Sequence, residues 1–232
     1  SFKHNDLAHL EIKLSKVKGK KIIIVEAVYS MDGDSPEFEQ LVELLNKYDA
    51  ELIIDEAHSF GVAGQKGLGV VVDKKLSNRV LATIYPLGKA VGSSGCFIAG
   101  SDTLKTFLIN FCRSFIYSTA PSSTIVKEVR SQLNDVFISE NRIDLLEKKK
   151  YFLDRINHKN ILTGENSAIV SFEYGAVDVK KIESMLLKNG IVVKAILYPT
   201  VPKGTERLRI CFHSFNSRKE IDFLLNVLNQ YN

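Results

Sequence analysis

Polar or ionisable side chains closely follow three apolar runs of the sequence. In chain order they are Ser30 after the run 20–25, Asp55 and His58 after the run 51–54, and Lys89 after the run 80–84. Ligands of open parallel sheets bind beyond the carboxyl ends of the strands. If the three runs are strands of such a sheet, these side chains meet at one edge, and we expect an active site there.

A carboxylate and an amine dominate this set of residues. Asp55 ends an apolar strand, so it loses hydration and needs a cationic or hydrogen-bonding partner; a structural salt bridge is the alternative to a functional role. Lys89 lies among small residues over 88–95, which lets backbone approach a ligand closely. Its amine could stay a solvated charge, contact a phosphate, or act as a nucleophile with a lowered pKa. His58 taken alone is more often a packed or surface histidine.

Two arginines alternate with an apolar residue near the C-terminus. Arg207 and Arg209 flank Leu208, so both guanidinium groups lie on one face of a predicted strand. A planar guanidinium matches the geometry of a carboxylate ligand. The alternative is an ion pair at the edge of a sheet.

The elements that must position these residues alternate in the first half of the chain. Apolar runs predict strands over 20–25, 51–54, 80–84 and 96–99, and helical spacing predicts helices over 36–48 and 102–111. Alternation of strands and helices indicates a mainly parallel sheet covered by helices.

The second half of the chain has a different pattern. It predicts one long helix over 122–157, strands over 168–172, 191–196 and 208–212, and helices over 177–189 and 217–230. Ser217 and Glu220 form a capping-box sequence at the start of the last helix. We therefore expect a small α+β domain with its boundary near residue 125, which gives domains 1–125 and 126–232.

Four glycines, at positions 61, 64, 67 and 69, do not make a phosphate-binding loop. The sequence G-x-x-x-x-G-K-[ST] occurs nowhere in the chain, and these glycines do not lead from a strand into a helix. We predict a tight irregular loop here.

The composition is typical of a globular protein. Of 232 residues 45% are hydrophobic, and 31 basic against 27 acidic residues give a net charge of +4. No basic block resembles a nucleic-acid-binding arm, and the longest apolar run is too short to span a bilayer, so we expect neither nucleic acid nor membrane as a partner. Cys96, Cys112 and Cys211 fit no zinc motif, and their odd number predicts buried free thiols in a cytoplasmic protein.

The tetrad at 55–58 reads Asp-Glu-Ala-His and is compatible with two kinds of site. In a DEAH-type nucleotide-driven motor, Asp55 would hold Mg²⁺ and Glu56 would polarise water, but the chain shows no Walker A sequence and no basic and aromatic features for binding single strands. In a pyridoxal-phosphate (PLP) site, a strand-end Asp pairs with the pyridine nitrogen and a lysine from a later strand end forms the Schiff base. Asp55 and Lys89 supply both groups, so this interpretation explains more residues.

Several segments, in the same order, resemble the α-oxoamine synthases, which are PLP enzymes of the aspartate-aminotransferase fold. They are HNDLAHLE (4–11), EAVYSMDGDSP (26–36), LIIDEAHSFGVAGQKGLG (52–69), GKAVGSSG (88–95), IYSTAP (116–121) and PTVPKGTERLRI (199–210). The resemblance implies an α/β PLP-transferase of fold type I with a mainly parallel sheet and a small C-terminal α+β domain. Family members carry a substantial N-terminal part that cannot be located in this sequence, and we expect the native protein to contain it.

The resemblance also assigns roles around the cofactor. Lys89 would form the Schiff base with PLP and remove the substrate Cα proton. Asp55 would pair with the pyridine nitrogen, His58 would hydrogen-bond the phenolic oxygen, and Ser30 would lie close to the cofactor.

Further roles extend to the substrate and to a second subunit. Arg209 would hold the amino-acid carboxylate, and Thr200 would line the substrate site. Ser118 and Thr119 would reach the phosphate of the partner subunit's cofactor, because family sites form at a homodimer interface. Pro86 departs from the family, which has a phosphate-binding Thr at this position; proline has neither a hydroxyl nor an N–H.

The activity implied by the resemblance is acyl transfer with decarboxylation. The segment 199–210 is most similar to the family member that condenses L-alanine with a pimeloyl thioester in biotin synthesis, with coenzyme A or acyl-carrier protein as the thiol. Other members, such as glycine C-acetyltransferase, are alternatives. A non-catalytic homologue is a third interpretation, which the proline at position 86 favours.

Overall fold

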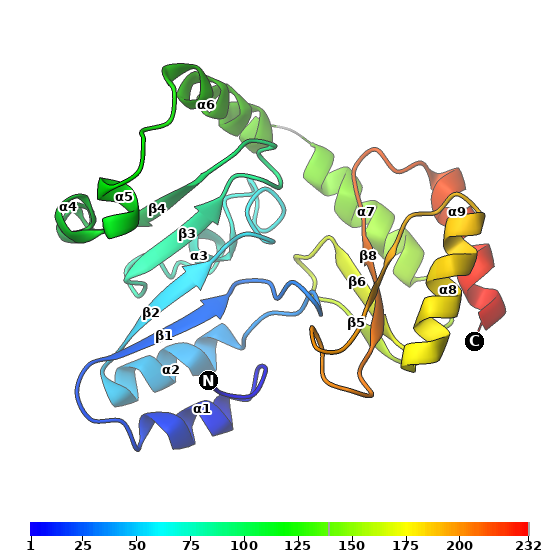
Figure 1. Cartoon of the computed structure of the whole chain (residues 1–232), viewed down its shortest axis with the longest axis horizontal. Coiled ribbons are helices and arrows are strands. Elements are labelled where there is room, and N and C mark those ends of the chain that lie inside the picture. The colour runs from blue at the N-terminus through cyan, green and yellow to red at the C-terminus, as the bar shows by residue number, and fades with distance from the viewer. Residues whose placement is uncertain (139, 232) are drawn as a thin grey trace. The chain divides into compact units, whose positions relative to one another are not determined.

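The computed structural model describes residues 1–138 and 140–231 and divides the chain into two compact units (Figure 1). Unit 1 comprises 1–28 and 35–138, and unit 2 comprises 29–34 and 139–232. The division falls later than the boundary expected near residue 125. The reason is that the stretch predicted as one helix over 122–157 forms two helices, α6 (Ser123–Ile138) and α7 (Asn141–Leu153), with the division between them.

Unit 1 is built on a four-stranded sheet of order β1-β2-β3-β4. The strands are β1 (Lys21–Glu26), β2 (Ala50–Asp55), β3 (Ala82–Pro86) and β4 (Cys96–Gly100). The first three are parallel and β4 is antiparallel to β3. The prediction of a mainly parallel sheet is confirmed. β2 ends at Asp55, as predicted, whereas β3 ends at Pro86, beyond the predicted run 80–84.

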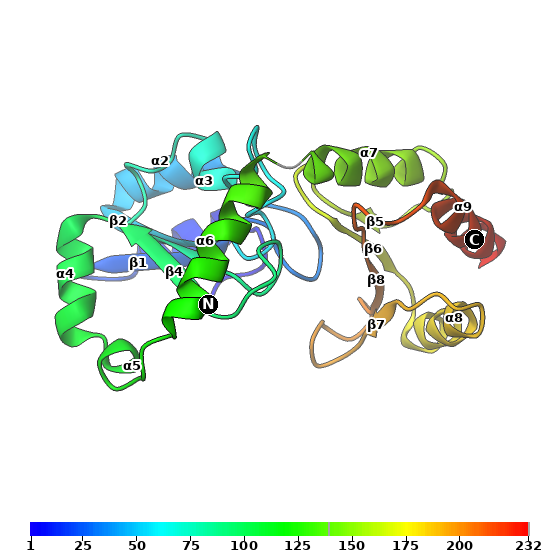
Figure 2. The same cartoon turned by 90° about the horizontal axis from the view of Figure 1, so that it is seen from above.

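The helices of unit 1 follow or separate these strands. They are α1 (Leu7–Leu14), α2 (Phe38–Tyr48), α3 (Val70–Asp73), α4 (Asp102–Phe111), α5 (Arg113–Ile116) and α6 (Ser123–Ile138). α2 and α3 lie along one side of the sheet (Figure 2), where Val70 and Val71 of α3 share a core with Leu41 of α2. α6 belongs to unit 1 because Val129 and Leu133 pack against the cluster around Tyr85.

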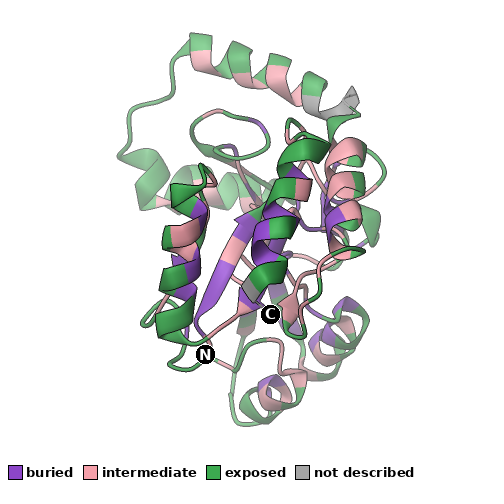
Figure 3. Ribbon diagram, turned by 90° about the vertical axis from the view of Figure 1, so that its right-hand side faces the viewer, coloured by how far each residue is buried: buried purple, intermediate pink, exposed green. Residues whose placement is uncertain are grey.

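Side-chain alternation along β1 separates the two faces of this sheet. Ile23 and Val25 are buried against the helices, whereas Ile22 and Ile24 point to the other face and are 56% and 66% exposed. Buried residues gather on the strands and on one side of several helices (Figure 3). The hydrophobic core of unit 1 therefore lies between α1, α2, α3 and one face of the sheet.

Unit 2 holds an antiparallel sheet of order β5-β6-β8-β7. Its elements are α7 (Asn141–Leu153), β5 (Ile161–Leu162), β6 (Ile169–Glu173), α8 (Ala176–Lys188), β7 (Lys194–Ile196), β8 (Arg207–Cys211), α9 (Arg218–Leu228) and η1 (Asn229–Tyr231). Phe152, Phe172 and Leu208 are fully buried in its core. The predicted capping box of Ser217 and Glu220 opens α9.

The segment 29–34 lies in unit 2 although its neighbours in the sequence lie in unit 1. The Ser171 hydroxyl on β6 donates to the Met31 carbonyl at 2.7 Å. Gly33 has a φ of +73°, and a Cβ there would lie 2.9 Å from the Ile169 carbonyl oxygen, so only glycine fits this approach.

Two further features of the described residues are the length and polarity of the helices and the exposure of the cysteines. Among the described residues, no helix combines the length and the apolar character that a membrane crossing requires. Cys96 and Cys211 are exposed and Cys112 is half-buried, and all three are free, so the expectation that the thiols are buried is wrong. Cys96 begins β4, an edge strand whose residues are mostly exposed, and Cys211 is the last residue of β8.

Candidate active site

Lys89 and His58 lie in contact beyond the carboxyl ends of β3 and β2. The Lys89 Nζ atom is 3.0 Å from the His58 Nε2 atom. Lys89 is exposed and His58 is half-buried, so the pair faces outward from unit 1. The parallel pairing of β2 with β3 brings together two residues that are 31 positions apart in the sequence. This contact agrees with the prediction that the two side chains meet at one edge of the sheet.

Asp55 is the last residue of β2 and is half-buried. Its Oδ1 atom accepts a hydrogen bond from the Ala57 N–H at 2.7 Å. In the sheet register Asp55 lies between Glu26 of β1 and Ile84 of β3. The structure thus supplies a carboxylate three residues before His58, at the same end of the sheet.

Glu56 differs from Asp55 in its surroundings. Its side chain is fully buried, and its carboxylate accepts from the Val70 and Val71 N–H groups at 3.0 and 2.7 Å and from the Ser59 hydroxyl. Burial raises the pKa of the Glu56 carboxyl, while these hydrogen bonds act in the opposite direction. A carboxylate held by three protein donors is not placed to polarise a water molecule, which argues against the motor interpretation of this tetrad.

Arg209 and Ser30 are brought together within unit 2. The Arg209 Nε atom donates to the Ser30 carbonyl oxygen at 2.6 Å. Arg207, two residues earlier on β8, is buried and forms ion pairs with Asp32 and, at 3.4 Å, with Glu173. Both arginines reach other polar groups of unit 2, but only Arg209 is half-buried and able to face a ligand.

The remaining predicted site residues lie on exposed loops. Ser118 and Thr119 follow α5, where the Ser118 hydroxyl donates to the Ser114 carbonyl. The Thr200 N–H donates to the Leu197 carbonyl at 2.9 Å, and its side chain is exposed. Pro86 ends β3 opposite Cys96 of β4, so the position at which the family has a phosphate-binding Thr carries no donor here.

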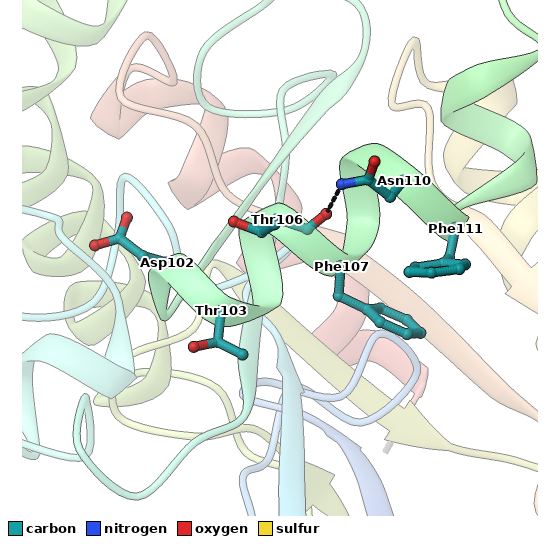
Figure 4. Close-up of a pocket in the computed structure, with 6 residues that line it drawn as sticks. All are labelled: Asp102, Thr103, Thr106, Phe107, Asn110 and Phe111. Atoms are coloured by element: carbon teal, nitrogen blue, oxygen red, sulfur yellow. Dashed lines mark hydrogen bonds between the residues drawn. The ribbon is translucent and has the colours of Figure 1, made fainter.

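The structure also has a hollow along α4 that is separate from these residues. Figure 4 shows the six side chains that line it: Asp102, Thr103, Thr106, Phe107, Asn110 and Phe111. All belong to one helix, and the Asn110 side chain donates to the backbone carbonyl of Thr106 at 2.7 Å. None of the predicted site residues lines this hollow, so it is not the candidate site.

The carboxylate of Asp55, the imidazole of His58 and the amine of Lys89 lie at or beyond the carboxyl ends of β2 and β3. The family model described as aminotransferase class I and II matches residues 1–228, and the chain belongs to this family. Matched structures of serine palmitoyltransferase contain PLP, and PLP is the cofactor of the family. The predicted family of PLP-dependent enzymes, the predicted aminotransferase-like fold and the predicted cofactor PLP are confirmed.

Several curated relatives of this chain carry the name of one enzyme. The 8-amino-7-oxononanoate synthase of Herminiimonas arsenicoxydans is 36% identical over 98% of this chain and 61% of its own length. The enzyme of the same name from Lysinibacillus sphaericus is 32% identical over 99% and 60%. The chain thus spans about 60% of the length of the curated relatives that it matches.

Two solved structures of related enzymes superpose on this chain. The 8-amino-7-oxononanoate synthase of Francisella tularensis is 29% identical and superposes with a TM-score of 0.83 over 98% of this chain and 67% of the other. The Sphingomonas wittichii serine palmitoyltransferase reaches a TM-score of 0.90 over 99% and 59%, but at 22% identity it shows the fold alone.

Proposed function

We propose that this protein is a PLP-dependent acyltransferase that condenses L-alanine with a pimeloyl thioester. A carbon–carbon bond forms, the thiol leaves, CO₂ is lost, and 8-amino-7-oxononanoate results. The observation that carries the proposal is the contact between Lys89 Nζ and His58 Nε2 at 3.0 Å, at the sheet end that also carries Asp55. The names of the curated relatives supply the product, and the resemblance of segment 199–210 supplies the choice of substrates.

The residues of unit 1 fit PLP by the chemistry of their side chains. Lys89 would hold the cofactor through its amine, Asp55 would keep a proton on the pyridine nitrogen, and His58 would donate to the phenolic oxygen. When bound, PLP supplies an electron sink for the charge that develops at the substrate Cα. Pro86 offers the phosphate no hydrogen bond, so other groups must hold it.

Lys89 also has the properties of the proton-transferring group. Once the substrate amine has replaced it, its own amine can accept the Cα proton and later return a proton to the product carbon. His58, 3.0 Å away, can accept a hydrogen bond from the Lys89 amine and hold it in place.

Arg209 is the proposed anchor for the carboxylate of the amino acid. Its Nε atom is engaged with the Ser30 carbonyl, which fixes the plane of the guanidinium and orients its terminal N–H groups. Thr200 is proposed to line the same substrate site. A homodimer, with Ser118 and Thr119 serving the partner subunit's cofactor, completes the proposal.

The first test is a visible absorption spectrum of the full protein with PLP. We expect a band from lysine-bound cofactor that is lost in Lys89→Ala and kept in the control Lys105→Ala, which removes an exposed lysine of α4. Addition of L-alanine should change the band, whereas glycine and L-serine should not.

The outcomes separate the candidate functions. A response to glycine or serine instead of alanine would move the assignment to another α-oxoamine synthase. A wild-type protein that gives no band with PLP would overturn the catalytic proposal and favour a non-catalytic homologue.

A further inference from the structure

Glu56 is a buried carboxylate at the junction between the sheet and the loop that carries His58. Its N–H donates to the Ile84 carbonyl at 2.9 Å, so its backbone continues the pairing of β2 with β3. Its side chain has no solvent exposure. A buried charge is costly unless hydrogen bonds satisfy it, which makes its partners informative.

The partners of this carboxylate lie at both ends of the loop 56–71. Ser59, near the beginning, donates its hydroxyl, and Val70 and Val71, at the start of α3, donate their N–H groups. N–H groups in the first turn of a helix have no partner within the helix and need one from outside. One side chain therefore draws the two ends of the loop together.

The glycines of this loop fit the same arrangement. The Gly61 N–H donates to the Gly67 carbonyl at 2.8 Å, and the Gly69 N–H donates to the Ala63 carbonyl at 3.2 Å. Gly69 has a φ of +94°, and a Cβ there would lie 2.6 Å from the Glu56 Oε2 atom. The predicted tight loop thus closes around the Glu56 carboxylate, which occupies the space of a side chain at position 69.

Both neighbours of His58 in the sequence, Ala57 and Ser59, donate a hydrogen bond to a carboxylate. The Ala57 N–H donates to Asp55, and the Ser59 hydroxyl donates to Glu56. The backbone of Ala57 and the side chain of Ser59 are anchored in this way. The position of the His58 imidazole therefore depends on the Glu56 contacts, although Glu56 itself is buried away from the reacting groups.

We propose that Glu56 is a positioning residue: by closing the loop 56–71 it holds the His58 imidazole against the Lys89 amine. This inference rests on the proposed function for its catalytic meaning, but the contact it concerns exists without cofactor. It assigns to Glu56 a role that differs from the polarisation of water in the motor interpretation and that the proposed PLP contacts do not include.

The test is a double-mutant cycle read at His58 by NMR titration of its ring in the full protein without PLP. Replacement of Lys89 by Ala should raise the His58 pKa, because a neighbouring ammonium disfavours the imidazolium. In a Glu56→Gln background, where the amide nitrogen cannot accept a hydrogen bond, the same replacement should raise it by less than half as much.

Glu51→Gln is the matched control, since it makes the same change at an exposed position of β2. In this background Lys89→Ala should act on His58 as it does in the wild-type protein. Ser59→Ala removes only one donor and should weaken the coupling in the same direction; it carries the test if Glu56→Gln fails to fold. An undiminished Lys89 effect in folded Glu56→Gln or Ser59→Ala protein would overturn the proposal, because a merely stabilising role does not change this coupling.

Failure of this inference can be distinguished from failure of the proposed function. A wild-type protein that shows Lys89–His58 coupling but gives no visible band with PLP retains the positioning role and loses the catalytic one. A protein that gives the PLP band but shows coupling independent of Glu56 retains the catalytic role and loses the positioning one.

Discussion

Asp55 and Glu56 are adjacent in the sequence, but their carboxylates lie in different environments. Asp55 is half-buried and accepts one backbone N–H, so it keeps capacity for a ligand. Glu56 is fully buried and accepts from three protein donors. Asp55 is the last residue of β2, whereas Glu56 begins the loop 56–71 and joins its two ends with its side chain.

Lys149 is a buried amine of unit 2 for which a dependence of stability on pH can be predicted. It lies on α7, and its Nζ atom donates to the carbonyls of Gly164 and Glu165 at 2.6 and 3.1 Å. Burial lowers its pKa to about 8 from the ordinary 10.5. Between these pH values the unfolded state binds more protons than the native state, so the free energy of unfolding rises with pH. At pH 7 the amine is protonated in both the native and the unfolded state, so Lys149 adds no pH dependence to the free energy of unfolding there.

Replacement of Lys149 by Met should remove that rise between pH 8 and 10.5. It should also destabilise unit 2 by about 1–3 kcal/mol, because two carbonyl oxygens lose their donor. Urea unfolding followed by the methyl NMR signals of Leu208 and Ile210 would measure both effects within unit 2. Lys150→Met, at an exposed neighbour on α7, should keep the wild-type slope. An equal slope in Lys149→Met would contradict the assignment.

Elements that depend on local pattern could be predicted from the sequence. The β-branched apolar runs gave β1 and β2 to within one or two residues, and α4 was predicted with its observed bounds. α1 was missed although Leu7, Leu10 and Leu14 have helical spacing and Asp6 accepts from the His9 N–H. The break between α6 and α7 could not be predicted, because no Pro or Gly marks it.

Contacts between distant segments could be predicted only where a general rule of sheet geometry applies. The rule that ligands bind at the carboxyl ends of parallel strands predicted that Lys89 and His58 lie together, and alternation predicted that both arginines lie on one face of β8. The pairing of Arg207 with Asp32 joins residues that no local pattern connects, and it depends on segment 29–34 entering unit 2. The role of Glu56 likewise needed the far end of its loop to be located.

The ion pair of Arg207 with Asp32 should stabilise the seating of segment 29–34 in unit 2. Arg207 is 5% exposed, and removal of one partner of a buried pair leaves an uncompensated charge. Asp32→Asn should therefore lower the stability of unit 2 by about 3 kcal/mol, with the remaining Glu173 contact limiting the loss.

The same urea unfolding experiment would measure this loss. Asp178→Asn is the matched control, because it breaks an exposed pair with Lys181 on α8 and should cost less than about 0.5 kcal/mol. Equal effects of the two substitutions would show that the Arg207 pair does not hold the segment.

At the scale of the whole molecule, each of the two units contains some of the predicted site residues. Asp55, His58 and Lys89 belong to unit 1, and Ser30 and Arg209 belong to unit 2. Each unit has its own hydrophobic core, so each set is held by separate packing.

Mixed dimers can test whether Ser118 and Thr119 serve the partner subunit. If they do, neither Lys89→Ala dimers nor Ser118→Ala/Thr119→Ala dimers hold an intact site. A mixed dimer of the two variants holds one, because the subunit that retains Lys89 receives Ser118 and Thr119 from the other. Unfolding and refolding the two variants together should therefore restore acyltransferase activity that neither shows alone. If both residues act within their own subunit, mixing restores nothing, since each site then lacks one contribution.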